Sequence, residues 1–474
     1  MNKTIANGRG EASGFRVVAE FGGAGLRRGA GRANRSVSGS RGHSPQQLLA
    51  KLYHRRFSVK ARRGFAVCIY RAARYVRVVS NEFSTAAHWS GDFDESGLQR
   101  WAEDLRRQLR APRVALGLVF MSPKYFSSAK QILEILRVHA RIPLLAGCSS
   151  QGLIADHREF EQGGGITLGL YALSDAELQA LHFTPPQVEE ANGPAYWHLK
   201  TGVEPRRTNG WLVFIEPFHL DSETWLRTWN EAYAPLPVLG GVAGGDPAEQ
   251  RTQLYLNGEV FEEGGVAVSV GGAVRLAGVI SQGCTPIGDT WTLTKVDQNV
   301  IHEIGNRPAY EVLAETFGKL SPEEQRQARG NLFIGLVVNE YLEDFHRGDF
   351  LIRNLLGADP RSGSIAIGAL PRAGQTIQFQ RRDAAAATDD MNELLTRAKR
   401  DLAATTLYGG CLCSCNGRGR GLFGEPDHDA KMVQQRLGPI GLAGFFCNGE
   451  LGPIGEKNFL HSFTAALALF VKRS

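Results

Sequence analysis

Residues 411–429, CLCSCNGRGRGLFGEPDHD, gather thiols, guanidinium groups, amides and carboxylates around glycines. Within them, residues 419–424 have the G-x-G-x-x-G spacing with which a glycine-rich turn holds a dinucleotide pyrophosphate at a helix N-terminus. Two observations argue against that use. Glu425 and Asp427 place negative charge where the pyrophosphate would lie, and only the 50 residues from 425 to 474 remain for the rest of such a fold. We therefore expect no nucleotide cofactor.

Three cysteines of the same stretch, Cys411, Cys413 and Cys415, alternate along the chain. Alternating side chains on a strand point to one face, whereas zinc-binding cysteines usually sit two to four residues apart on a turn. We expect a small apolar core face here and no metal ion. The chain has seven cysteines, an odd number, which favours reduced thiols over a disulfide framework.

A second cluster could supply a nucleophile. Cys148, Ser149 and Ser150 directly follow an apolar run, in a turn that carries Gly152, and His157 is the nearest potential base. The G-x-S-x-G nucleophile elbow is absent. An acyl-transfer or hydrolytic enzyme that uses Cys148 or Ser149 is therefore the alternative function, and a role without catalysis is favoured.

The glycine-rich turns favour a binding site. Arg418 and Arg420 can donate paired hydrogen bonds to a carboxylate or phosphate, while Asp246 and Glu450 can hold an ammonium group. Opposite charges on glycine-rich loops suit a zwitterionic ligand, because each buried charge needs a partner. Either arginine could instead pair internally with a carboxylate at residue 425 or 427. The predicted ligand-binding residues are Cys148, Ser149, Gly152, Gly244, Asp246, Asn416, Arg418, Arg420, Asn448 and Glu450.

Hydrophobic periodicity predicts the elements that position these residues. Residues 93–110 have apolar side chains at helical spacing, and residues 114–120 and 142–150 are buried strands on either side of a second helix. Asp221 is the expected N-cap of another helix, and Asn257-Gly258 is a strong hairpin signal. The first part of the chain therefore begins as α/β and continues with antiparallel strands.

At three places an apolar strand breaks into glycines and small polar residues, in LLAGCSSQG, LGGVAGGD and LAGFFCNGELG. Such strand ends bring backbone close to a ligand or to another strand. From Pro308 the pattern restarts, and residues 362–370 and 374–383 read as a hairpin. We predict an α+β (mixed α/β) fold with two layered domains, 81–302 and 303–474, whose mixed, largely antiparallel sheets are flanked by helices.

The charge of the chain is divided unevenly. Residues 1–80 contain 17 Lys and Arg and two acids, a charge of +15, so the remainder carries −9 of the total of +6. The Gly/Arg/Ser-rich composition of residues 1–80 predicts disorder. Three interpretations stay open: an organelle transit peptide, a basic arm for RNA or membrane, or translated sequence upstream of the true start, which we favour.

The composition also restricts partners and location. The acidic remainder lacks the clustered basic charge that binding of nucleic acid by the folded body would need. No run of about 18 apolar residues occurs, so we expect no membrane span and a cytoplasmic location.

The motifs resemble those of the FIST sensory proteins. The resemblance rests on LLAGCSSQGLI, GGGITLGLYAL and LGGVAGGD in the first half, and on SCNGRGRGLFG, LAGFFCNGELGPIG and FLHSFTAALALF in the second. It implies an N-terminal FIST domain over residues 112–302 and a C-terminal FIST domain over 303–455. It also implies intracellular sensing of a small ligand, such as an amino acid, with no catalytic activity.

Many FIST proteins carry a transmitter such as a kinase or cyclase, and this sequence shows none. We therefore expect a two-domain protein that binds a zwitterionic or anionic metabolite between its halves and signals through a separate protein partner. The site residues come from charge and glycine placement, because the resemblance supplies no ligand contacts. On this hypothesis Arg418→Ala abolishes binding and leaves the fold intact.

Overall fold

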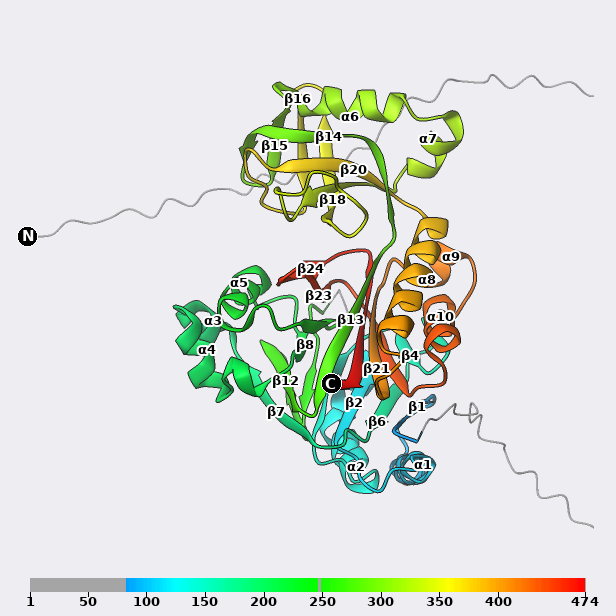
Figure 1. Cartoon of the computed structure of the whole chain (residues 1–474). Helices are drawn as coiled ribbons and strands as arrows, with labels where there is room; N and C mark the ends of the chain where they lie inside the picture. Colours follow the sequence, from blue (N-terminus) through cyan, green and yellow to red (C-terminus); the bar gives the residue numbers. More distant parts are fainter. Residues whose placement is uncertain (1–81, 246–248, 474) are drawn as a thin grey trace, which may run out of the picture. The chain divides into compact units, whose positions relative to one another are not determined.

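The computed structural model describes residues 82–245 and 249–473 (Figure 1). The expected disorder of residues 1–80 and the predicted site residue Asp246 lie outside the described residues. Four sheets and their covering helices make up the described chain. The expected α+β class, with mixed and largely antiparallel sheets flanked by helices, is confirmed.

Three of the sheets have six strands each and share one plan, in which a central parallel pair has two antiparallel strands on one side and an antiparallel hairpin on the other. Sheet 1 consists, in spatial order, of β1 (Ser84–Trp89), β6 (Ile166–Tyr171), β2 (Leu116–Met121), β3 (Leu145–Ser149), β10 (Leu254–Leu256) and β11 (Glu259–Phe261). Sheet 2 consists of β7 (Ala176–Phe183), β12 (Gly265–Gly272), β8 (Trp211–Ile215), β9 (Val238–Val242), β23 (Glu450–Ile454) and β24 (Lys457–His461). Sheet 3 consists of β13 (Val274–Gln282), β25 (Thr464–Lys472), β21 (Leu407–Cys415), β22 (Leu442–Cys447), β4 (Leu153–Ala155) and β5 (Arg158–Phe160).

Each parallel pair is joined by a crossover that contains a helix, as parallel strands require. These helices are α2 (Ala129–His139), α5 (Ser222–Tyr233) and α10 (His428–Leu437). Further helices are α1 (Glu95–Gln108), α3 (Pro185–Glu190), α4 (Pro194–Thr201), α8 (Ala384–Asp401) and α9 (Arg420–Phe423), with short 3₁₀ turns η2 (Pro123–Ser128) and η3 (Pro205–Arg207). The expected N-cap is confirmed, since Asp221 Oδ1 accepts a hydrogen bond of 3.0 Å from the Thr224 backbone N–H.

The fourth sheet is formed by the segment between β13 and α8. Its strands are β14 (Cys284–Asp297), β20 (Thr376–Arg382), β17 (Leu332–Val337), β18 (Phe350–Asp359), β19 (Ser364–Ile367), β15 (Val300–Ile304) and β16 (Arg307–Pro308). Helices α6 (Ala309–Gly318) and α7 (Pro322–Ala328) belong to the same segment. The expected hairpin of residues 362–370 with 374–383 is wrong, because β19 pairs with β15 and β18 while β20 pairs with β14 and β17.

The hairpins of the first three sheets are exchanged in a closed cycle. The hairpin that follows β3 pairs with β22 in sheet 3, the one that follows β22 pairs with β9 in sheet 2, and the one that follows β9 pairs with β3 in sheet 1. We call each parallel pair, with the hairpin that follows it in the sequence, one unit: β2, β3 and β4–β5; β8, β9 and β10–β11; β21, β22 and β23–β24. The three units are related by an approximate threefold repetition. Two of these sheets contain strands from both residues 81–302 and residues 303–474. The predicted boundary therefore separates two parts of the sequence, but it does not separate the sheets.

The exchange places one core between the three sheets. Along β2, Leu118 and Phe120 face this central core, while Val119 and Met121 face α1 and α2 on the other side of sheet 1. Phe120 stacks against Phe445 of sheet 3, with ring centroids 4.7 Å apart. The second strands of the parallel pairs can therefore run deep into the protein and end next to one another.

Candidate functional site

The ends of the three parallel pairs are tied together by backbone hydrogen bonds. Gly244 N–H donates to the Ser149 carbonyl (2.8 Å), Val242 N–H to the Gly449 carbonyl (2.9 Å), and Phe446 N–H to the Gly152 carbonyl (2.9 Å). We call residues 149–152, 242–245, 415–417 and 446–449 the strand-end ring. Segments that are far apart in the sequence thus meet at one place. They include five of the ten predicted site residues: Ser149, Gly152, Gly244, Asn416 and Asn448.

Glycines let the strands of each pair approach closely. A Cβ on Gly147, Gly240 or Gly444 would lie 1.7, 1.9 or 2.0 Å from a carbonyl oxygen of the neighbouring parallel strand. The three positions are equivalent in the threefold repetition, since they pair with Val119, Val213 and Leu412 in the same register. The three glycine-containing strand ends of the sequence are therefore the three copies of one structural element.

The potential nucleophiles are occupied by structural roles. The Ser149 hydroxyl donates to the Gly244 carbonyl (2.7 Å) and accepts from the Gln253 N–H (2.8 Å). Cys148 is fully buried, and burial raises the pKa of its thiol well above the ordinary value, which disfavours the thiolate. No hydrogen bond among the described residues joins His157 to either side chain. This geometry gives the alternative enzymatic reading no activated nucleophile.

Side-chain amides are the exposed polar groups of the ring. Asn416 Nδ2 donates to Asn448 Oδ1 (2.9 Å), and Gln151 Nε2 donates to the Gly245 carbonyl (3.0 Å). All three side chains belong to exposed residues. Gln151 and Asn448 occupy equivalent positions of the repetition, and sequence reasoning missed Gln151 because nothing in a single sequence distinguishes it from other surface glutamines.

The two predicted glycines of the ring hold it closed. A Cβ on Gly152 would lie 2.8 Å from the Phe446 ring, and one on Gly244 would lie 3.2 Å from the Ser150 hydroxyl oxygen. Ser150 in turn donates a hydrogen bond of 2.5 Å to the Phe446 carbonyl. The glycines therefore give room for contacts between the three units, which supports the ring as a rigid scaffold for the amides.

Arg418 lies beneath the ring and is 1% exposed. Its Nε and Nη2 donate to the two carboxylate oxygens of Asp429, at 2.7 and 2.9 Å. Although burial alone would raise the pKa of Asp429, Arg418 and His428 hold that pKa well below its usual range. The internal partner of Arg418 is thus Asp429 at the start of α10, and not the carboxylates of residues 425 or 427.

One donor of Arg418 is unused, because its Nη1 is buried and has no hydrogen-bond partner among residues 82–245 and 249–473. A Cβ on Gly283 would lie 3.3 Å from this atom. Arg420 differs: it is exposed, and its backbone N–H donates to Glu161 Oε1 (2.9 Å). The two arginines therefore occupy different environments.

Glu450 is fully buried at the start of β23. It accepts hydrogen bonds from Thr464 N–H (3.2 Å) and the Cys447 thiol (3.4 Å). Burial foremost raises the pKa of Glu450 to about 8. At neutral pH its carboxyl is mostly protonated and carries little charge for a ligand ammonium group.

Arg382 is a further residue near the ring that sequence reasoning missed. Its Nη1 donates to the Gly417 carbonyl (3.0 Å), and its guanidinium lies 5.7 Å from the centroid of the Phe463 ring. Both side chains line a cavity of about 390 Å³, together with Phe333 and Asn354. The two adjacent arginines in QRRD are the only local signal, and they do not show which of them turns toward the ring.

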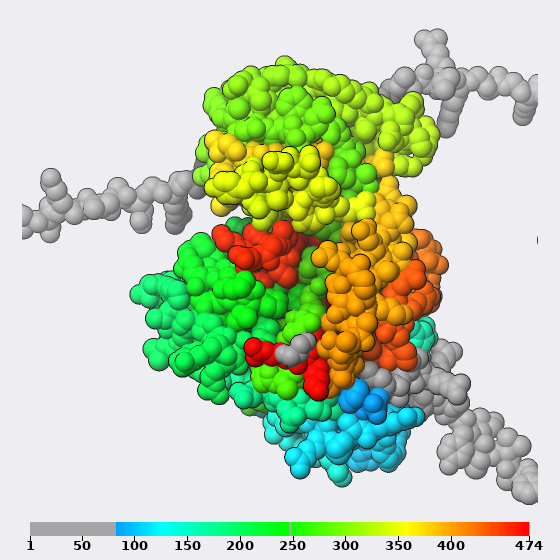
Figure 2. Space-filling model, in the orientation of Figure 1, coloured from blue at the N-terminus to red at the C-terminus, as the bar shows by residue number. Residues whose placement is uncertain are grey.

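A second cavity, of about 460 Å³, lies between α5, β18 and β24. Arg353 lines it and donates to the Leu460 carbonyl (3.0 Å). In the space-filling view the β23–β24 hairpin, in red, reaches the surface between the green and yellow segments (Figure 2). The described residues contain no group of His, Cys, Asp and Glu able to hold a metal ion, and no helix long and apolar enough to cross a membrane.

Comparisons with known proteins agree with the motif resemblance. Residues 115–307 match the model of the FIST N domain, and residues 309–453 match that of the FIST C domain. An uncharacterized protein of Mycobacterium tuberculosis is 38% identical over 372 residues, which cover 78% of this chain and 94% of that protein. An uncharacterized protein of Methanocaldococcus jannaschii is 20% identical over 287 residues, 59% of this chain and 54% of that protein.

A search of solved structures finds cyanuric acid hydrolase from A. caulinodans at 9% identity and a TM-score of 0.33. The match covers 83% of this chain and 99% of that chain. A likeness of this size carries no argument about activity.

Proposed function

The chain belongs to the FIST family, and we propose that it binds an amino acid or related small metabolite at the strand-end ring and signals through a separate protein. FIST domains are described in general as sensory domains for small ligands. The ligand, its place on the ring, the partner and a cytoplasmic location are our proposals.

The observation that carries the proposal is the pairing of Asn416 with Asn448. Their mutual hydrogen bond leaves one amide acceptor, Asn416 Oδ1, and one amide donor, Asn448 Nδ2, on two exposed side chains that this bond holds together. A carboxamide, or a carboxylate beside an ammonium group, complements such a neighbouring donor and acceptor. This supports a zwitterionic or amide-bearing ligand that is held by hydrogen bonds. The positive charge of Arg418 is already paired with the Asp429 carboxylate.

The exchange of hairpins supports a sensory role. The exposed amides of Gln151, Asn416 and Asn448 come from the loops after β3, β21 and β22, and the loop after β9 also belongs to the ring. A ligand on the ring would therefore contact units whose hairpins pair with one another's sheets. Binding there would tighten the units together, and a partner that touches them could respond. The occupied hydroxyl of Ser149 and the buried thiol of Cys148 give no comparable support to acyl transfer.

A thermal-shift screen of the full chain against amino acids, amides and organic acids tests the proposal. A ligand at 100 times its dissociation constant should stabilise the fold by about 2.7 kcal/mol. Asn448→Ala should remove most of that shift, because it deletes the exposed donor. Asn192→Ala, an exposed asparagine outside the ring, is the matched control.

Two outcomes would count against the ring. If no compound in the screen shifts the transition, binding of this ligand class is wrong. If a compound shifts the parent and Asn448→Ala equally, while Arg382→Gln loses the shift, the ligand lies in the cavity of Arg382 and Phe463 instead.

A further inference from the structure

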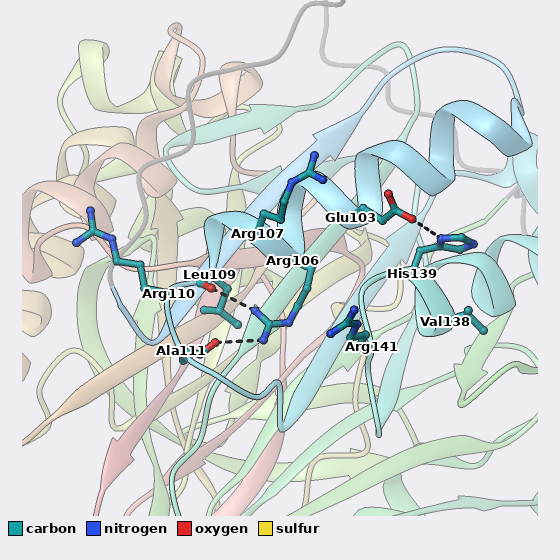
Figure 3. Close-up of a pocket in the computed structure, with 9 residues that line it drawn as sticks. All are labelled: Glu103, Arg106, Arg107, Leu109, Arg110, Ala111, Val138, His139 and Arg141. Carbon is teal, nitrogen blue, oxygen red and sulfur yellow. Dashed lines mark hydrogen bonds and ion pairs between the residues drawn. The ribbon is translucent and has the colours of Figure 1, made fainter.

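A groove at the C-terminal ends of α1 and α2 gathers four arginines (Figure 3). Arg106, Arg107, Arg110 and Arg141 line a cavity of about 590 Å³. Among the described residues that line it, Glu103 alone carries a carboxylate. The lining therefore has a strong positive charge, in a chain whose residues beyond 80 carry −9.

Some of these groups are already engaged. Glu103 pairs with His139 at 2.9 Å, and Arg107 pairs with Asp104. Arg106 donates to the carbonyls of Leu109 (3.2 Å) and Pro112 (2.7 Å), which holds the loop after α1 against the helix. Figure 3 shows these two arginines on α1 and the Glu103–His139 pair beside them.

Arg110 and Arg141 are different. Neither has an ion-pair partner among the described residues, and Figure 3 draws no interaction from either guanidinium group. Arg110 and Arg141 lie two residues after the ends of α1 and α2. Other basic residues in the last turn of each helix already interact with its dipole. Within the described part of the chain, the groove therefore holds two cations without an ion-pair partner.

Arg141 occupies the left-handed position that ends α2. Arg141 has φ of 53°, and Ile142 N–H donates to the Arg137 carbonyl (2.9 Å), the helix-ending arrangement in which glycine is preferred at the left-handed position. A non-glycine residue there costs stability. An arginine in this place keeps a cation at the groove at that cost.

We propose that this groove docks an acidic segment of a protein partner, with carboxylates on Arg110 and Arg141 and an apolar side chain on Val138. Val138 lines the same groove and is 56% exposed. Arginine beside apolar surface is typical of protein interfaces. No residue of the groove belongs to the strand-end ring, so this inference goes beyond the proposed ligand site and can hold without it.

Other polyanions fit the groove less well. A compact phosphate in the groove would lie at the C-terminal ends of two helices. These ends carry the negative pole of the helix dipole, which disfavours an anion. A long nucleic acid would also meet the acidic remainder of the chain, whereas its binding needs cations along a continuous face. Neither ligand would use the exposed Val138.

The test uses the full chain and a 12-residue peptide of alternating glutamate and leucine, in which one leucine is photoreactive. Fluorescence anisotropy measures its affinity, and mass spectrometry maps its crosslinks. We expect crosslinks in residues 106–115 and 137–144. In the double variant Arg110→Gln/Arg141→Gly, we expect the peptide to bind the groove about tenfold more weakly. The mapping separates this site from any binding by the basic residues 1–80.

Matched controls make the result specific. Arg397→Gln/Arg436→Gln removes the same charge from α8 and α10 and should leave the groove crosslinks unchanged. Arg141→Gly relieves the left-handed backbone, so the variant should melt no lower than the parent. The proposal is overturned if crosslinks occur only in residues 1–80, if a glutamine-for-glutamate peptide crosslinks equally, or if a dT12 oligonucleotide or pyrophosphate competes for the groove as strongly as the acidic peptide.

Discussion

Arg418 and Asp429 form a bidentate ion pair in the interior of the protein, with both side chains at most 1% exposed. The pair joins the loop after β21 to the first turn of α10, directly beneath the strand-end ring. Ser414 adds a third hydrogen bond to the Asp429 carboxylate, at 3.2 Å. The arginine predicted from the sequence as a ligand contact is therefore also a part of the fold.

Arg418→Ala should destabilise the protein by about 3–5 kcal/mol, because it leaves the buried Asp429 carboxylate without its partner. This expectation replaces the one drawn from the sequence, in which the fold stayed intact. Urea unfolding followed by circular dichroism measures the loss. Arg418→Met/Asp429→Leu removes both charges and should recover much of it; if the double variant is no more stable than the single one, the carboxylate is not the cause.

Glu450 should make the protein less stable as pH rises from 6.5 to 8. Its pKa is about 8 in the fold against an ordinary value of 4.5, so in this window the folded state keeps a proton that the unfolded state has lost. The free energy of unfolding then falls with a slope of up to about 1.4 kcal/mol per pH unit. Denaturant titrations at several pH values measure this slope.

Glu450→Gln should flatten the dependence, and Glu456→Gln, on an exposed residue, should not. Buried histidines oppose this trend near pH 6.5, because burial lowers the pKa values of His88 and His461 to about 4 in the fold while their unfolded forms titrate around the ordinary value of 6.5. Their effect is the same in the parent and in both variants. Glu159, whose pKa burial raises to about 7, adds a similar effect below that pH. An equal slope in the parent and in Glu450→Gln would show that Glu450 ionises normally in the fold.

Alanine at Gly147, Gly240 or Gly444 should prevent folding. Each added Cβ would lie 2.0 Å or less from a backbone carbonyl oxygen of the paired strand, and a backbone atom in a central strand cannot move aside. Gly357 in β18 is the matched control, since a Cβ there would meet nothing within 4 Å. Soluble yield and circular dichroism check the difference; a folded Gly240→Ala protein would contradict the close approach of β8 and β9.

The native protein should not react with nucleophile-directed probes at Cys148 or Ser149. Cys148 is fully buried with a raised thiol pKa, and the Ser149 hydroxyl is held between Gly244 and Gln253. Iodoacetamide and a fluorophosphonate, followed by peptide mapping, test the two residues. Labelling of either one in the folded protein at a rate above that of an unfolded control would revive the enzymatic alternative.

The sequence predicted local features well where one residue type has one structural use. Asn257 has a left-handed φ of 57° in the turn between β10 and β11, as its Asn-Gly pair indicated. The glycine-containing strand ends were also recognised as one recurring theme. Their threefold relation could not be predicted, because it depends on which strand each hairpin joins, and that is set by contacts far apart in the chain.

Charged site residues were harder to assign. The glycine loop around Arg418 indicates a special position, but a sequence cannot distinguish a ligand partner of this arginine from an internal one. It also cannot distinguish Asp429, the partner in the structure, from the nearby Glu425 and Asp427. Glu450 was expected to carry a charge, but only the three-dimensional structure reveals the burial that raises its pKa. A single sequence shows where a motif lies along the chain, but it does not show how far each charged side chain is buried.

The cyclic exchange of hairpins makes each third of the protein depend on the other two. A fragment that ends near residue 302 would lack the partner strand of β4 and the β23 that pairs with β9, leaving two sheet edges open to aggregation. Separately expressed halves should be insoluble, and co-expressed halves should assemble. Melting should accordingly be a single cooperative event for the three units, since none can leave without uncovering the next.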